Sequence, residues 1–296
     1  MSERYPVFDV SSEARDLVEP MGTKRKFWFT RDGSQWLFKY SRRQTGEHWS
    51  EKVASEIGAQ LELPVARVEL AVCDGEPGAC SQSFLPADGV LVHGNELLQE
   101  IDQTYPRTQL RGVSKHTVDA VFEQLRNVDP PPGAPAGLSA ADCFVGYLLL
   151  DALIGNGDRH HENWAVVHKT ASRHLAPSYD HASSLGRELR DEVRVARMKG
   201  IDPGHTVERY AARAASAFYA SSTDVKPLSP IDAFLVASRR RPTASLYWLA
   251  RLAELGQDTV ENIVNSVPPD LITEPARRFA VAITAWSRPH LLAVAA

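Results

Sequence analysis

The stretch "LLLDALIGNGDRHHENWAVV", residues 148–167, limits the folds open to this chain more than any other feature. An apolar run ends at a Gly-Asn-Gly turn, charged and imidazole side chains follow, and the chain then becomes apolar again. Apolar runs favour burial, whereas charged side chains need water or polar partners. The pattern therefore predicts a polar loop held between two buried elements, which stability alone does not require.

The elements on either side of this loop are predicted to be a helix and a hairpin. Ser139 and Asp142 form a capping-box pattern, which starts a helix that ends at the Gly-Asn-Gly turn of residues 155–157. After the loop, "NWAVVHKTASRHLAPSYD" has the pattern of a short hairpin with "KTAS" as its turn. Because a hairpin brings its two ends together, we expect Asn163 and Asp180 to converge.

Asp158, Asn163 and Asp180 together predict a site for phosphoryl transfer. Mg²⁺ prefers hard oxygen ligands and keeps waters and phosphates as further ligands, and Asn163 and Asp180 offer such oxygens. Asp158 is then placed to accept or orient the proton of an attacking hydroxyl. This is the spacing of a kinase catalytic loop: an Asp, four further residues, an Asn, and later a metal-binding Asp. A polar turn capped by its own Asp and Asn is the simpler alternative for a single pair.

The first 85 residues have the pattern of strands around one helix. "KFWFT" and "QWLFKY" alternate as strands do, and the Asp-Gly in "RDGS" predicts a hairpin turn between them. Lys39 falls on the strand face opposite Trp36 and Phe38. "VARVELAVC" and "ACSQSFL" predict two more strands, joined by the turn "DGEPG".

One amphipathic helix is predicted between these two strand pairs. Apolar side chains recur there every four residues, and Pro64 ends the pattern; they are Trp49, Val53, Ile57 and Leu61. Beyond residue 85 helical patterns dominate, and the sequence has no internal repeat. The chain is therefore expected to be of the α+β class, with its strands gathered mainly near the N-terminus.

Composition narrows the class of protein and its surroundings. The 296 residues are 43% hydrophobic and 24% charged, as in soluble globular proteins. A net charge of −4 argues against direct nucleic-acid binding, although "GTKRK" and "SRRRP" are local basic stretches. Three cysteines without metal-type spacing imply no disulfide framework. Because the sequence has neither a signal-peptide pattern nor a membrane-length apolar run, we expect a cytoplasmic protein without a membrane partner.

At this point the sequence resembles a known family. "IGNGDRHHENWAVV" followed by "LAPSYDHASSLG" is similar to the catalytic loop and metal-binding segment of HipA-type serine/threonine kinases, and closer still to the shorter stand-alone HipA-like kinases. "WLFKY", "LPVARV" and "LVHGNEL" extend the resemblance over about residues 20–190. The "GDRHHEN" loop also resembles that of phosphoinositide-type kinases and, more loosely, that of aminoglycoside-type phosphotransferases.

The resemblance implies a bilobal protein-kinase-like fold that phosphorylates protein Ser or Thr with ATP and Mg²⁺. A small β-rich lobe with one main helix would span residues 1–85, and a larger, mostly helical lobe would span residues 86–296. Carried over position by position, Asp158 is the catalytic base, while Asn163 and Asp180 bind the metal. Lys39 is the strand lysine that holds the α- and β-phosphates.

The resemblance also implies an acidic partner for Lys39 on the following helix. Glu51 occupies that position, thirteen residues before Pro64. On a helical wheel, however, Glu51 lies well away from the apolar face, whereas Glu47 and Glu56 lie closer to it. All three glutamates therefore stay open as the ion-pair partner.

The usual Gly-rich loop over the phosphates is absent, and "MGTKRKFW" stands in its place. Gly22 and Thr23 can offer backbone N–H groups to a phosphate, and Lys24 or Lys26 can add positive charge. In HipA-like kinases this loop can carry an autophosphorylated Ser or Thr, which makes Thr23 a candidate regulatory site. "SYDH" replaces Asp-Phe-Gly, so an activation segment of the usual kind is not implied.

The histidines of the loop and the end of the β-rich part supply the last candidates. Adjacent histidines point apart, which weakens a zinc interpretation of His160 and His161. His160 has two alternatives, simple solvation or a hydrogen bond to the γ-phosphate or to Asp180. Phe84 and Leu85, where the β-rich part ends, are the candidate hinge at which adenine meets backbone groups.

Several rival functions share these residues. A small-molecule or lipid kinase would use the same loop, a catalytically impaired module would bind ATP without transferring phosphate, and a metal-dependent hydrolase would use the histidines. Retention of Lys39, Asp158, Asn163 and Asp180 together argues against the impaired module. Family members often act as toxins, so the resemblance implies an antitoxin-type regulator as a partner beside the protein substrate.

Overall fold

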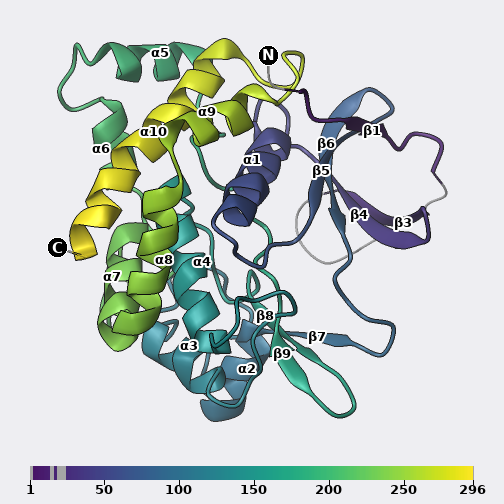
Figure 1. Ribbon diagram of the computed structural model, residues 1–296, viewed down its shortest axis with the longest axis vertical. Coiled ribbons are helices and arrows are strands. Elements are labelled where there is room, and N and C mark those ends of the chain that lie inside the picture. Colours follow the sequence, from purple (N-terminus) through teal and green to yellow (C-terminus); the bar gives the residue numbers. More distant parts are fainter. Residues whose placement is uncertain (1–2, 14–16, 19–24, 296) are drawn as a thin grey trace.

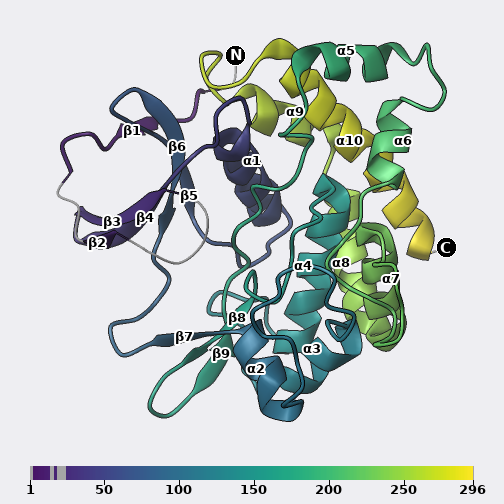
Figure 2. The same cartoon turned by 180° about the vertical axis from the view of Figure 1, so that it is seen from behind.

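The computed structural model describes residues 3–13, 17–18 and 25–295 of the chain. A twisted sheet with helix α1 (Glu47–Gln60) forms one part, and most of the helices form the other (Figure 1). Helix α1 contacts both the sheet and the other helices, and it lies between them in both face-on views (Figures 1 and 2). This is the predicted α+β class, with a β-sheet part and a helical part.

The first sheet has six strands in the order β1-β5-β6-β4-β3-β2. Its pairings are antiparallel except for β1, which runs parallel to β5. The two predicted hairpins form β3–β4 and β5–β6, whereas β1 and β2 were not predicted. The strands are β1 (Val7–Asp9), β2 (Leu17–Val18), β3 (Lys26–Arg31), β4 (Ser34–Tyr40), β5 (Val68–Cys73) and β6 (Glu76–Gln82).

The β3–β4 hairpin fixes the direction of Lys39. Asp32 and Gly33 both have positive φ, 51° and 73°, which is the turn geometry that a two-residue hairpin needs. Along β4, Trp36 and Phe38 are buried in an aromatic cluster on one face of the sheet. Lys39 alternates with them and points to the opposite face, as predicted.

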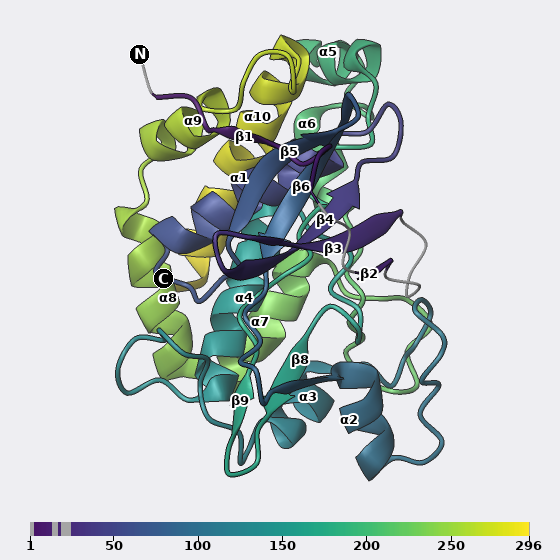
Figure 3. The ribbon, with the colours of Figure 1, turned by 90° about the vertical axis from the view of Figure 1, so that its right-hand side faces the viewer.

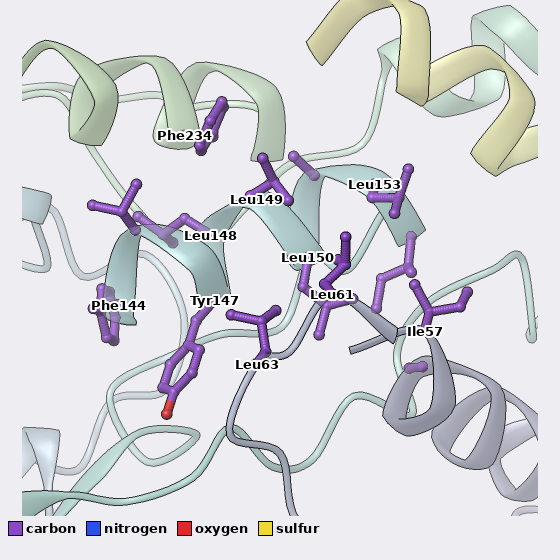
Figure 4. Close-up of a cluster of buried hydrophobic side chains, with 14 of the residues drawn as sticks. Ile57, Leu61, Leu63, Phe144, Tyr147, Leu148, Leu149, Leu150, Leu153 and Phe234 are labelled. Carbon is purple, nitrogen blue, oxygen red and sulfur yellow. The ribbon is translucent and has the colours of Figure 1, made fainter. Parts of the chain in front are cut away.

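Ten elements follow in the helical part, and α4 lies at its centre. Every residue of α4 except Asp142 is buried, and α4 packs against α7, α8 and α10. In Figure 4, Leu149 and Leu150 of α4 lie between Phe234 and the end of α1. The elements are α2 (Gly94–Ile101), α3 (Val118–Gln124), α4 (Ala140–Ile154), α5 (Asp191–Lys199), α6 (Val207–Ala212), α7 (Pro230–Arg240), α8 (Pro242–Glu254), α9 (Gln257–Asn265), α10 (Glu274–Leu292) and a 3₁₀ turn at Ala293–Ala295.

A second, three-stranded sheet receives the chain where it leaves the polar loop. Its order is β7 (Val90–His93), β8 (Ala165–His168) and β9 (Arg173–Leu175), all antiparallel. It lies beside the six-stranded sheet when the molecule is seen from the sheet side (Figure 3). The β8–β9 hairpin was predicted and β7 was not. In the part of the chain that the structure describes, no helix is long and apolar enough to cross a membrane.

Candidate functional site

A buried ion pair holds the polar loop at the end of α4. The guanidinium of Arg159 makes two hydrogen bonds to the carboxylate of Asp151, one of them 2.8 Å long. Both side chains are almost completely buried. The amide of Asn156 also donates to Asp151, at 2.8 Å. Asp151 stands within an apolar run of the sequence, which gives no sign of this pair.

The same arginine joins the loop to the segment that follows β9. Arg159 donates to the carbonyl of Asn163 at 3.1 Å and to the hydroxyl of Ser178 at 2.9 Å. Tyr179 adds a second link, because its hydroxyl donates to the carbonyl of Glu162 at 2.9 Å. Residues 158–163 and 178–184 are therefore held together, as the hairpin argument predicted.

Asp158 belongs to the loop and borders a cavity. Ser183 donates a hydrogen bond to its carboxylate at 3.2 Å, and Arg111 lies 3.7 Å from the other carboxylate oxygen. The Asp158 side chain keeps 30% of its surface exposed, so a hydroxyl can reach it. Asp158 also lines a cavity of about 700 Å³ on the side of the helical part. No pattern in the sequence indicated Ser183 or Arg111 as a neighbour of Asp158.

The two predicted metal ligands lie on the two tethered segments. The amide nitrogen of Asn163 donates to the carbonyl of Asp158 at 2.6 Å, which leaves its single amide oxygen as the possible ligand. Asp180 has a φ of 57°, in the left-handed region, and its side chain is 31% exposed. One carboxylate and one amide oxygen suit Mg²⁺, which completes its shell with water and phosphate.

Lys39 reaches this site from the six-stranded sheet. Its ammonium lies 3.2 Å from the carboxylate of Asp180. Burial works to lower the pKa of Lys39, but the charges of Asp180 and Glu51 outweigh it and raise that pKa. Lys39 therefore stays protonated at neutral pH.

Of the three candidate glutamates, Glu51 acts most strongly on the charge of Lys39. Its carboxylate accepts a hydrogen bond from the backbone of His181 at 2.9 Å and lies near Lys39 and Asp180. Burial works to raise the pKa of Glu51, yet the hydrogen bond from His181 helps to lower it overall. Glu47 pairs instead with Arg187 at 2.9 Å, and Glu56 pairs with Lys52 at 2.6 Å.

The two histidines of the loop have different surroundings. His160 accepts a hydrogen bond from the backbone of Glu162 at 3.2 Å, which folds it back onto its own loop. His161 is 1% exposed and shares a hydrogen bond of 2.8 Å with the hydroxyl of Tyr105. Among the described residues, no cluster of three or more His, Cys, Asp or Glu is placed to hold a metal ion. The structure thus gives no support to a zinc-type site at these histidines.

Phe84 and Leu85 lie on the connection between the two sheets. Both are partly buried against a small cluster that includes Tyr179, and the rings of Phe84 and Tyr179 are 5.8 Å apart. The candidate hinge therefore packs against Tyr179, the residue that precedes Asp180. Three other candidates, Gly22, Thr23 and Lys24, lie outside the described residues.

A strand lysine, a buried helix glutamate and a polar loop under a β-sheet define the class of protein: this is the fold of protein kinases. The crystal structure of the Helicobacter pylori proinflammatory kinase CtkA has that fold, with a TM-score of 0.77 and 18% identity, covering 98% of this chain and 97% of that one. HipA of Shewanella oneidensis MR-1, crystallised with HipB and operator DNA, gives a TM-score of 0.57 at 13% identity, covering 94% of this chain and 64% of that one.

The family follows from the sequence itself. The family of HipA-like C-terminal domains matches residues 18–228, so this chain belongs to that family. A Sinorhizobium fredii (strain NBRC 101917 / NGR234) protein named "Putative kinase Y4mE" is 26% identical over 148 residues, which are 48% of this chain and 34% of that protein. The chain thus matches about a third of that relative. Family and fold together confirm the resemblance to HipA-like kinases and support phosphotransferase activity.

Proposed function

We propose that this protein is an ATP- and Mg²⁺-dependent kinase that phosphorylates Ser or Thr of a protein substrate. One observation carries the proposal: Lys39 from the sheet and Asp180 from the helical part meet at 3.2 Å, next to a loop that presents Asp158 and Asn163. A nucleotide bound between the two parts would meet a cation on one side and oxygen ligands on the other. That charge pattern suits a triphosphate with its metal.

Each residue then has a definite task. Lys39, kept cationic by Asp180 and Glu51, would bind the phosphates, while Asn163 and Asp180 would hold Mg²⁺, which neutralises phosphate charge. Asp158 would accept the proton of the acceptor hydroxyl, which arrives from the cavity side. Ser183 and Arg111 contact the Asp158 carboxylate and would hold it in place.

The remaining candidates surround this centre. Phe84 and Leu85 would present backbone groups to the adenine, and His160 would hydrogen-bond the γ-phosphate. Gly22, Thr23 and Lys24 would cover the phosphates, with Thr23 as a site of autophosphorylation. An antitoxin-type regulator is proposed as a partner because the HipA structure from Shewanella oneidensis contains HipB.

Labelled ATP and Mg²⁺ test the proposal directly. The wild type, incubated with and without cell lysate, is expected to label itself or a lysate protein on Ser or Thr. Asp158→Asn and Asp180→Ala should each lower labelling at least about 100-fold, because each removes a group that acts in the transition state. Asp202→Asn is the matched control, because the Asp202 side chain is 63% exposed and bonds only with its own loop in the described structure.

A small-molecule kinase is the second candidate, favoured by one observation. The cavity beside Asp158, at about 700 Å³, falls within the range of small-molecule sites. Label recovered in a metabolite, with none in protein, would establish that alternative. Labelling at background level by both wild type and Asp158→Asn, with ATP still bound, would instead identify a nucleotide-binding module.

A further inference from the structure

The cavity beside Asp158 is a built part of the fold, and we call it the acceptor groove. Its walls come from the polar loop, from α5 and α6 and from residues 213–217. The polar loop can approach residues 213–217 closely because residue 157 is a glycine. A Cβ on Gly157 would lie 2.4 Å from the carbonyl oxygen of Ala215. Residues 213–217 are held in place by a hydrogen bond of 3.0 Å, which the carbonyl of Ala217 accepts from His116.

Arginines dominate the charge of this groove. Four arginines line it (Arg111, Arg187, Arg197 and Arg213), against two carboxylates, Asp158 and Glu188. The whole chain carries a net charge of −4, whereas the side chains that line the groove include more arginines than carboxylates. Because Asp158 is the proposed base, these charges lie where an acceptor hydroxyl would have to arrive.

The four arginines differ in how far the protein already uses them. Arg187 is committed, with hydrogen bonds to Glu47 at 2.9 Å and to Ser183 at 3.2 Å. Arg197 lies over the ring of Tyr210, and its buried Nε has no hydrogen-bond partner among the described residues.

The other two arginines point to an external partner. Arg111 is 89% exposed and only 3.7 Å from Asp158, which is a loose contact. Arg213 is exposed and forms no ion pair with any described residue. Guanidinium groups favour carboxylates and bind them through paired hydrogen bonds. The groove therefore holds positive charge that the fold itself does not neutralise.

From this charge distribution we infer that the acceptor is an acidic protein segment, in which the Ser or Thr is flanked by Asp or Glu. The inference rests on the proposed kinase function and adds the class of substrate. Complementary charge raises the association rate and fixes the direction in which the segment lies. Arg111 and Arg213, which both line the groove, would contact the acidic residues while Asp158 meets the hydroxyl.

Three Ser peptides of equal length, flanked by Glu, Ala or Lys, test the inference with the full-length protein, Mg²⁺ and labelled ATP. The wild type should phosphorylate the Glu peptide with kcat/KM at least about ten-fold above that for the Lys peptide. Arg213→Glu should reduce or reverse this ratio, losing rate on the Glu peptide and gaining rate on the Lys peptide. Such a charge swap cannot come from misfolding, which lowers both rates.

Arg209→Glu is the matched control. Arg209 is exposed on α6, four residues from Arg213, and does not line the groove. It should keep the wild-type ratio, and the preference should weaken with added salt. The inference is overturned if the three peptides are labelled equally, if the Lys peptide is preferred, or if none is labelled while a lysate protein is. Loss of all labelling, autophosphorylation included, would count against the kinase function itself.

Discussion

At the scale of single residues, one arginine determines the shape of the candidate site. Arg159 links the end of α4, the carbonyl of Asn163 and the hydroxyl of Ser178 from a buried position. The guanidinium has enough donors in one plane to serve all these acceptors, which a lysine does not. Among the residues that the structure describes, Asp151 alone forms an ion pair with it, so the loop depends on this pair.

Arg159→Ala is therefore expected to lower the free energy of unfolding by about 3–5 kcal/mol, because it leaves the Asp151 carboxylate buried without its partner. Urea unfolding measures the change. Arg240→Ala is the control, since Arg240 pairs with Asp119 through a similar two-bonded geometry on the surface, and about 0–1 kcal/mol is expected there. Similar losses in the two variants would contradict the role given to burial.

Much of the candidate site could be predicted from the sequence, but the glutamate could not be chosen. Strand alternation predicted the face on which Lys39 lies, and the hairpin predicted that Asn163 and Asp180 converge. That Lys39 shares a site with them was implied only by the family resemblance. The helical wheel failed for Glu51 because it assumes one apolar face and one wet face. Helix α1 lies between the sheet and the helices, so nearly all its faces are buried, Glu51 included.

At the scale of elements, α4 is the support on which the loop stands. Ser139 caps its first turn and exchanges hydrogen bonds with Asp142, and Gly155 ends it with a φ of 66°. Between these ends the helix is buried on every side, which fixes its position against α7 and α8. The cap therefore contributes to stability at a distance from the chemistry.

Replacing that cap separates stability from function. Ser139→Ala removes the hydroxyl that accepts from the backbone of Asp142 at 3.3 Å and donates to its carboxylate at 2.6 Å. We expect the free energy of unfolding to fall by about 1 kcal/mol, with phosphate transfer per folded molecule unchanged. Ser139→Thr keeps a hydroxyl and should restore most of the loss. An equal loss in both variants, measured by thermal unfolding, would mean that the hydroxyl has no capping role.

Elements with local signals could be predicted, and those defined by distant partners could not. Turn residues identified the β3–β4, β5–β6 and β8–β9 hairpins. Strand β1 has three residues and exists because it lies parallel to β5, some 60 residues away in sequence. Strand β7 likewise pairs with β8 across α2, α3 and α4. Neither pairing leaves a pattern within its own short stretch of chain.

At the scale of the whole molecule, a buried aromatic and histidine network ties distant segments together. His116 accepts a hydrogen bond from Trp164 at 3.2 Å and donates to the carbonyl of Ala217 at 3.0 Å. His161 bonds to Tyr105 at 2.8 Å, and the rings of His116 and His161 are 6.1 Å apart. The polar loop and the groove wall are thus held by groups that must stay neutral.

Burial lowers the pKa of His116 to about 3 and that of His161 to about 4. In the unfolded chain a histidine titrates near pH 6.5. Between about pH 6.5 and pH 4 the unfolded state therefore binds protons that the native state does not. Stability rises with pH wherever the unfolded state binds more protons, so the free energy of unfolding should fall as the pH falls through this window.

His116→Gln tests whether His116 causes this pH dependence. The glutamine amide can still donate and accept hydrogen bonds, but it does not titrate. The slope of unfolding free energy against pH between pH 6 and 5 should decrease by up to about 1.4 kcal/mol per pH unit, which corresponds to one proton. His205→Gln is the matched control for the substitution itself, since His205 is 64% exposed. Urea unfolding across this range would contradict the account if His116→Gln kept the full wild-type slope, because the acid sensitivity would then arise elsewhere in the molecule.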